Sequence, residues 1–126
     1  MREDIKELWV AALRSGKYVQ GQGQLATKDN GTVKFCCLGV LCQVLVDNKL
    51  LDITVATKTG YLTYDGAGLT LPDSVVQFCE LSENNPNVQF DGGLGGKYNE
   101  NAVPLAGMND YNESFPTIAD AIERSL

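Results

Sequence analysis

An apolar segment without any charged residue lies about one third of the way along the chain, between Lys34 and Asp47. Its beginning, residues 32–36, is an apolar run typical of a strand. From Cys37 onward the apolar residues recur with helical spacing, at positions 37, 38, 41, 44 and 45. We therefore predict a strand that leads into a helix buried on most sides, with the other elements packed around it.

Amphipathic segments at the two ends of the chain predict its first and last helices. Apolar residues with helical spacing form a single stripe over residues 4–15, and Trp9 lies on this stripe, which places it in the core. Gly16 follows as a stop signal. Towards the other end, Ser114 is a candidate N-cap for a helix from Phe115 to Ser125.

Turn signals between these helices predict strands. The pair Asn30-Gly31 predicts a hairpin whose second arm is the strand that leads into the buried helix. A second hairpin is predicted around residues 65–68, between Tyr61–Tyr64 and Leu69–Leu71. Pro72 then opens a third helix that we expect to extend to about residue 81.

The last third of the chain has less pattern. Residues 82–101 are polar and rich in glycine, which predicts a long loop with a short strand near residue 88. A small apolar plug at residues 103–106 leads to Asn109 and Asp110, which we expect to precede the last helix. The predicted fold class is α+β: one compact domain over residues 1–126, with about four helices on a small antiparallel sheet and the cysteine-rich helix buried at its centre.

Composition narrows the classes of partner. The chain has 126 residues, a net charge of −6 and only ten scattered basic residues. Nucleic-acid backbones and anionic membranes attract clustered Lys and Arg, so neither is an expected partner. No apolar run approaches the roughly 18 residues of a membrane span, and no signal peptide is recognisable at the start. We expect a cytoplasmic protein.

The absence of histidine removes most nucleophilic and zinc chemistry, because Cys–His pairs, Ser–His pairs and His-ligated zinc all require an imidazole. The four cysteines, at positions 36, 37, 42 and 79, do not have the spacing of zinc knuckles. We interpret them as reduced core residues and expect neither metal nor cofactor. One alternative stays open, because Cys36 and Cys37 lie where a helix N-terminus could stabilise a thiolate.

Two polar loops offer groups for ligand binding. Residues 91–97 are rich in glycine but differ from a Walker A loop, since Asp91 stands at its first position and Tyr98 follows Lys97. They could form a flap that covers a ligand with Lys97 and Tyr98. Asn109 and Asp110 are either turn and capping residues or the wall of a pocket, and Gln20 with Gly21 presents the same choice.

Several segments in a fixed order resemble a group of small, largely uncharacterised bacteriophage-encoded proteins. The resemblance covers nearly the whole chain and rests on five segments: Lys17-Tyr18-x-Gln20-Gly21-x-Gly23-x-Leu25, Phe35-Cys36-Cys37-Leu38-Gly39-Val40-Leu41-Cys42, Leu71-Pro72-x-x-Val75, Leu105-Ala106-x-Met108-Asn109-Asp110, and Ser114-Phe115-x-x-Ile118-Ala119-Asp120-x-Ile122-Glu123. It implies no set of catalytic residues. Small phage proteins of this size often act by binding, and one class sequesters nucleotide signals of bacterial immunity.

The leading hypothesis is therefore a non-enzymatic anti-defence protein, a sponge that sequesters a nucleotide-like immune signal in the host bacterial cytoplasm. The ligand would be a cyclic nucleotide or an ADP-ribose derivative, enclosed by a homo-oligomer. The candidate ligand-binding residues are Arg14, Lys17, Tyr18, Gln20, Gly21, Lys97, Tyr98, Asn109 and Asp110.

Two alternatives remain at this point. One is an inhibitor that binds a host protein through its acidic surface. The other is a small cysteine-dependent enzyme in which a carboxylate such as Asp110 assists a thiol.

Overall fold

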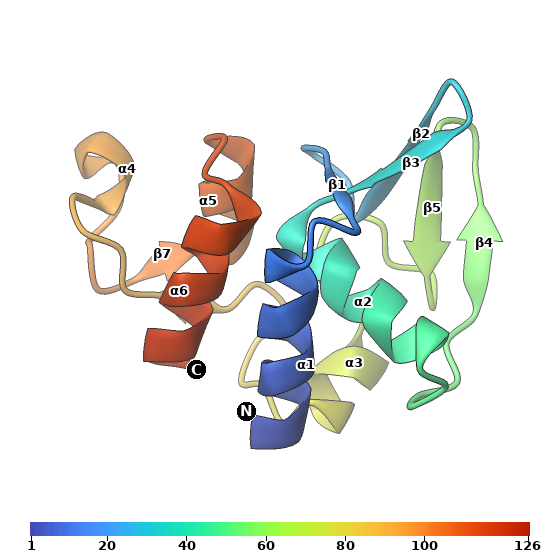
Figure 1. Cartoon of the computed structure of the whole chain (residues 1–126), viewed down its shortest axis with the longest axis horizontal. Helices are drawn as coiled ribbons and strands as arrows, with labels where there is room; N and C mark the ends of the chain where they lie inside the picture. Colours follow the sequence, from blue (N-terminus) through green and yellow to red (C-terminus); the bar gives the residue numbers. More distant parts are fainter.

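Six helices and seven short strands make up the fold, in a computed structural model that describes residues 1–126 (Figure 1). The helices are α1 (Glu3–Arg14), α2 (Cys37–Asp47), α3 (Asp73–Phe78), α4 (Gly93–Gly96), α5 (Leu105–Asp110) and α6 (Phe115–Ser125). The strands are β1 (Val19–Gln20), β2 (Ala26–Asp29), β3 (Thr32–Phe35), β4 (Val55–Thr57), β5 (Tyr61–Tyr64), β6 (Asn87–Val88) and β7 (Val103–Pro104). The predicted single α+β domain is confirmed.

The main sheet has the strand order β1-β3-β2-β5-β4, and β6 and β7 form a separate pair. The expectation of a purely antiparallel sheet is wrong in one place, because β1 pairs with β3 in parallel. The β2–β3 hairpin causes this: β3 returns in the direction of β1 and lies between β1 and β2. The sheet is therefore mixed, and β4 forms one of its edges.

The predicted hairpin at Asn30-Gly31 is confirmed. Both residues have positive φ, 50° and 82°, as the tight turn between β2 and β3 requires. The second predicted hairpin is confirmed only at its turn, where the backbones of Tyr64 and Ala67 bond each other; residues 69–71 form no strand, and β5 pairs with β4 instead. The turn at Lys58 fixes this pairing, since its N–H donates to the carbonyl of Tyr61 at 2.8 Å.

Helix α2 lies at the centre of the molecule, as predicted, and most of its residues are buried. The indole Nε1 of Trp9 donates to the carbonyl of Cys37 at 2.9 Å, which joins α1 to the first turn of α2. Gly39 allows β2 to approach the helix, since a Cβ at this position would lie 1.8 Å from the carbonyl oxygen of Leu25. The predicted core therefore depends on one close backbone contact as well as on apolar side chains.

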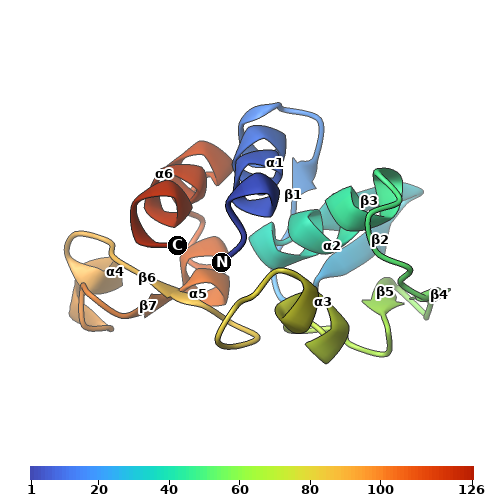
Figure 2. The same cartoon turned by 90° about the horizontal axis from the view of Figure 1, so that it is seen from below.

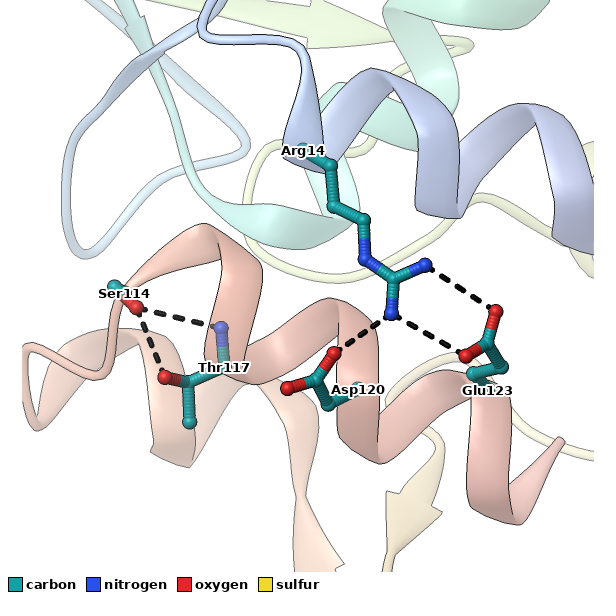
Figure 3. A network of polar contacts seen from close by, with 5 residues as sticks. All are labelled: Arg14, Ser114, Thr117, Asp120 and Glu123. Atoms are coloured by element: carbon teal, nitrogen blue, oxygen red, sulfur yellow. Dashed lines mark hydrogen bonds and ion pairs between the residues drawn. The ribbon is translucent and has the colours of Figure 1, made fainter.

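Helices α1 and α6 pack side by side and run in opposite directions (Figures 1 and 2). The bounds of α6 and its N-cap are as predicted, and Ser114 Oγ accepts a hydrogen bond from the N–H of Thr117 at 3.3 Å. At the far end of α1, Arg14 forms ion pairs with Asp120 and Glu123 of α6 (Figure 3). None of the six helices has both the length and the apolar character needed to span a membrane.

Residues 82–110 are more ordered than predicted. The expected apolar plug, residues 103–106, forms β7 and the start of α5, so Asn109 and Asp110 lie within this helix and do not precede α6 directly. The reason for the difference is the shortness of α5, which begins after Pro104 and contains Gly107, a weak helix former. Helix α3 is also shorter than predicted, because Glu80 adopts a positive φ of 56° two residues after its last residue.

Helix α4 is a single left-handed turn. Residues 92–96 all have positive φ, between 54° and 86°, and the N–H of Gly96 donates to the carbonyl of Gly92 at 2.8 Å. Left-handed turns disfavour L-residues by roughly 1–2 kcal/mol per residue, which explains why four of these five residues are glycine. Gly93 is further constrained, because a Cβ there would lie 1.9 Å from the carbonyl oxygen of Tyr98.

Candidate functional site

Four of the nine candidate binding residues come together around Asn109, whose side chain is fully buried with 0% exposure. Its Oδ1 accepts hydrogen bonds from Gln20 Nε2 at 2.9 Å and from the N–H of Cys37 at 3.2 Å. Its Nδ2 donates to the carbonyl of Gly21 at 2.7 Å. We call this arrangement the Asn109 anchor. Through the hydrogen bonds of one side-chain amide, it connects α5 with the start of α2 and with the segment at the end of β1.

The neighbouring contacts extend the anchor to the surface. Gln20 Nε2 also donates to the carbonyl of Glu113 at 2.8 Å, and Asp110 Oδ1 accepts from the N–H of Gly23 at 3.1 Å. Gln22 Nε2 donates to Asn112 Oδ1 at 3.0 Å. Gln20, Gly21, Asn109 and Asp110 therefore bind one another or adjacent backbone in this structure.

The other candidate residues at the start of the chain lie apart from the anchor. Arg14 binds Asp120 at 2.7 Å and Glu123 at 3.2 Å, and these carboxylates raise its pKa. The Tyr18 hydroxyl donates to Asp47 Oδ2 at 3.2 Å, and its ring packs edge-on against Phe35. The ammonium of Lys17 lies 5.5 Å from the centre of the Tyr18 ring.

Lys97 and Tyr98 form a third group with Tyr111, which follows α5. The Lys97 ammonium lies 4.9 Å from the centre of the Tyr111 ring and 5.7 Å from that of Tyr98. The adjacent Tyr111 side chain raises the pKa of Lys97. These contacts hold the left-handed turn against α5 through cation–π attraction.

All four thiols are free and buried. Burial raises the pKa of Cys36 and of Cys79 to about 11, and it raises the pKa of Cys37 and Cys42 as well. The helix N-terminus does not reverse this effect at Cys36, whose Sγ accepts a hydrogen bond from the N–H of Gly39 at 3.4 Å. A buried thiol with a raised pKa is a poor nucleophile.

The largest hollow on the surface lies between α6 and the segment that follows β6, and none of the nine candidate residues lines it. Its volume is about 500 Å³, within the range of small-molecule sites. Helix α6 contributes three side chains to this hollow, which we call the α6 hollow, and the segment after β6 contributes the other three. Its lining residues are Gln89, Phe90, Asp91, Thr117, Asp120 and Arg124.

Hydrogen bonds fix the two walls of the α6 hollow to each other. The N–H of Gln89 donates to Ser125 Oγ at 2.9 Å, and Arg124 Nη2 donates to the carbonyl of Gln89 at 3.3 Å. On the α6 wall, Thr117 Oγ1 accepts a hydrogen bond from Ser114 Oγ at 2.9 Å, and Arg14 holds Asp120 (Figure 3). Thr117 and Asp120 are therefore held by residues outside the hollow, and Arg124 is held by the backbone of Gln89 within it.

Arg124 has hydrogen-bonding capacity to spare. It forms no ion pair, and its one hydrogen bond, to Gln89, uses one of five N–H donors. Phe90 is half-buried against the core and contributes an aromatic ring to the same hollow. Asp91 adds an exposed carboxylate. An arginine, a phenylalanine and an aspartate thus line one hollow.

The sequence contained part of the signal for this hollow. The glycine-rich loop at residues 91–97, for which a ligand-covering flap was one alternative, begins at Asp91, which lines the hollow. Thr117, Asp120 and Arg124 recur at helical spacing on one face of α6. Polar residues with this spacing are typical of any solvated helix face, so the pattern alone does not distinguish a binding wall.

Comparison with known proteins gives a family and no nearer relative. Neither the curated proteins nor the solved structures include a match to the chain. A family model described as "Domain of unknown function (DUF8296)" matches residues 1–126. The chain therefore belongs to the DUF8296 family.

Proposed function

We propose that this protein is a non-enzymatic, phage-type anti-defence protein that sequesters a small nucleotide-like immune signal in the host bacterial cytoplasm. The observation that carries the proposal is the α6 hollow, where Arg124 has free donors beside the ring of Phe90 and the carboxylate of Asp91. These groups match the three parts of a nucleotide: phosphate, base and ribose.

Each match rests on ordinary chemistry. A guanidinium binds phosphate oxygens in a bidentate manner, and Arg124 has the donors to do so. An aromatic ring offers a stacking surface to a base, whatever its identity. The carboxylate of Asp91 accepts hydrogen bonds from the paired hydroxyls of a ribose.

Charge limits the ligand to one with few phosphates. Asp91 and Asp120 both line the hollow, and Asp120 is already paired with Arg14. Arg124 is thus the cation left to balance both Asp91 and an anionic ligand. Cyclic nucleotides and ADP-ribose derivatives fit this balance better than nucleoside triphosphates do.

Capture without chemical change is supported by the state of the thiols. The cysteines are buried and have raised pKa values, and none of them lines the α6 hollow. The hollow presents carboxylates, an amide, a hydroxyl and a guanidinium, which suit recognition by hydrogen bonds.

Isothermal titration with a panel of cyclic nucleotides and ADP-ribose derivatives tests the proposal. We expect one class of ligand to bind and to be recovered intact after the protein is denatured. Arg124→Gln should weaken binding by about 10- to 100-fold, the loss expected for a hydrogen bond to a charged group. Lys28→Gln, a change of the same charge on the β2–β3 hairpin, is the matched control and should bind normally.

Absence of heat across the whole panel would refute the proposal. Recovery of a chemically altered ligand would indicate an enzyme, and unchanged binding by Arg124→Gln would place the ligand elsewhere. Phe90→Leu keeps an apolar group against the core and removes the ring, so it should weaken ligands with a base more than ribose phosphate alone.

A further inference from the structure

The edge of the main sheet formed by β4 is open, and two apolar side chains beside it are exposed. Val55 on the strand and Leu50 before it are each 40% exposed. Strand β4 pairs with β5 on one side only, so its other side presents free backbone N–H and C=O groups. This edge lies at the opposite side of the molecule from α4, β6 and β7 (Figures 1 and 2).

A hollow lies directly before this strand. It has a volume of about 240 Å³, and three of its five lining residues are apolar: Val46, Leu51 and Ile53. The other two lining residues are Lys49 and Asp52. We call the hollow, Leu50 and β4 together the β4 face.

The charges of the β4 face have no partners within the chain. Neither Lys49 nor Asp52 forms an ion pair or a side-chain hydrogen bond, although the two lie at the rim of the same hollow. Lys49 also has a positive φ of 53°, at the turn that directs Leu50 outward into solvent. The face thus combines one positive charge, one negative charge, a projecting leucine and an apolar hollow.

We infer that the β4 face is the interface of a homodimer. Two-fold symmetry places the same surface on both sides, so a surface must complement itself to bind its copy. The β4 face does so: Lys49 of each chain can meet Asp52 of the other, and Leu50 of each chain can enter the other's hollow. These reciprocal contacts place the two-fold axis beside residues 49–52, just before β4.

The other edge of the sheet is less suited to this role. Strand β1 has only two residues, and the segment that follows it is fastened to α5 and the residues after it through Gln20, Gln22 and Gly23. Its edge is therefore short and partly covered. A dimer through the β4 face would leave the α6 hollow open on each chain, because the two lie on opposite sides of the molecule, so this inference does not depend on the proposed ligand.

Charge reversal and complementation test the interface. Wild-type protein should show a dimer whose population rises between about 1 μM and 1 mM in sedimentation velocity, the range of weak to moderate association. Lys49→Asp alone and Asp52→Lys alone should each weaken the dimer by about tenfold or more, because each change creates two like-charge contacts. A mixture of the two variants should restore the dimer, since each mixed pair regains opposite charges.

Lys17→Asp, which makes the same charge change as Lys49→Asp on an exposed residue before β1, at the other end of the sheet, is the control and should dimerise like the wild type. Far-UV circular dichroism establishes that each variant is folded. A wild-type protein that stays monomeric over this concentration range would overturn the inference. So would a dimer that both variants leave intact, or a mixture of variants that remains monomeric.

Discussion

The Asn109 anchor makes a sharp prediction about stability. Asn109→Ala removes the acceptor for the N–H of Cys37 and the donor to the carbonyl of Gly21, and both of these residues are buried. Each buried polar group without a partner costs about 1–3 kcal/mol. Two such groups give an expected loss of about 4 kcal/mol in the free energy of unfolding. The partner Gln20 is less affected, because it retains the carbonyl of Glu113.

A second substitution separates hydrogen bonding from packing. Asn109→Asp keeps the shape and the Oδ1 acceptor but turns the donor that faces the carbonyl of Gly21 into an oxygen. When ionised, the new carboxyl is a buried charge beside a carbonyl oxygen; when protonated, it can donate as the amide does. Burial and this contact should raise its folded-state pKa above the unfolded value of about 3.9.

The direction of the pH effect follows from linkage. A group with a raised pKa in the folded state binds its proton more tightly there, so its stabilisation is present below the unfolded pKa and is lost as pH rises through the folded pKa. The deficit of Asn109→Asp relative to wild type should therefore be small near pH 4 and should grow towards pH 7. Asn109→Ala carries no such group, and its deficit should stay constant.

Urea denaturation followed by far-UV circular dichroism at both pH values measures these differences. Asn101→Ala and Asn101→Asp, at an exposed position, are matched controls and should stay within about 0.5 kcal/mol of wild type. A loss below about 1 kcal/mol for Asn109→Ala would refute the anchor's structural role. An equal deficit of Asn109→Asp at both pH values would refute the assignment of the amide donor.

Three further predictions concern the backbone and the thiols. Gly39→Ala should cost more than about 4 kcal/mol or prevent folding, as seen in thermal melts, because its Cβ would overlap the carbonyl oxygen of Leu25. Gly95→Ala in the left-handed turn should cost about 1 kcal/mol in the same assay, because a Cβ there meets no other atom. Gly93→Ala should cost clearly more, because its Cβ would overlap the carbonyl oxygen of Tyr98, and equal losses for the two variants would contradict this account. The pKa of Cys79 is raised from 9.0 to about 11, so its stabilisation is present below pH 9 and is lost as pH rises towards 11. Between pH 8 and pH 10, the free energy of unfolding from urea titrations should therefore fall by about 1 kcal/mol more for the wild type than for Cys79→Ala. Parallel pH profiles of the two proteins would contradict this prediction.

Long periodic segments could be predicted from the sequence, and short ones could not. The stripes of α1, α2 and α6 each contain enough turns for the period to be visible, and their bounds were close to those observed. Helix α5 has only six residues, so its pattern does not exceed what a loop shows by chance. The left-handed turn has no hydrophobic pattern, and its glycines are the one feature of the sequence that indicates it.

The roles of polar side chains depended on contacts that no local pattern contains. Arg14 was expected to bind a ligand, but its partners Asp120 and Glu123 lie more than 100 positions later in the sequence. Asn109 was expected either to serve as a turn and capping residue or to line a pocket. Its Oδ1 does accept a free N–H, but that of Cys37 at the start of α2, and its Nδ2 donates to Gly21, so both contacts cross the core. The walls of the α6 hollow likewise meet only because β6 packs beside α6.

Trp9 gives this fold a natural spectroscopic probe. It is the only tryptophan of the chain, it is fully buried, and its indole N–H is bonded to the carbonyl of Cys37 at the start of α2. Its fluorescence therefore reports on the contact between the first helix and the centre of the molecule, whereas circular dichroism reports on all helices together. If α1 separates from α2 before the rest of the chain unfolds, the emission will shift to the red while the ellipticity is still native. The cooperativity of folding can thus be examined in the unlabelled, unmodified protein.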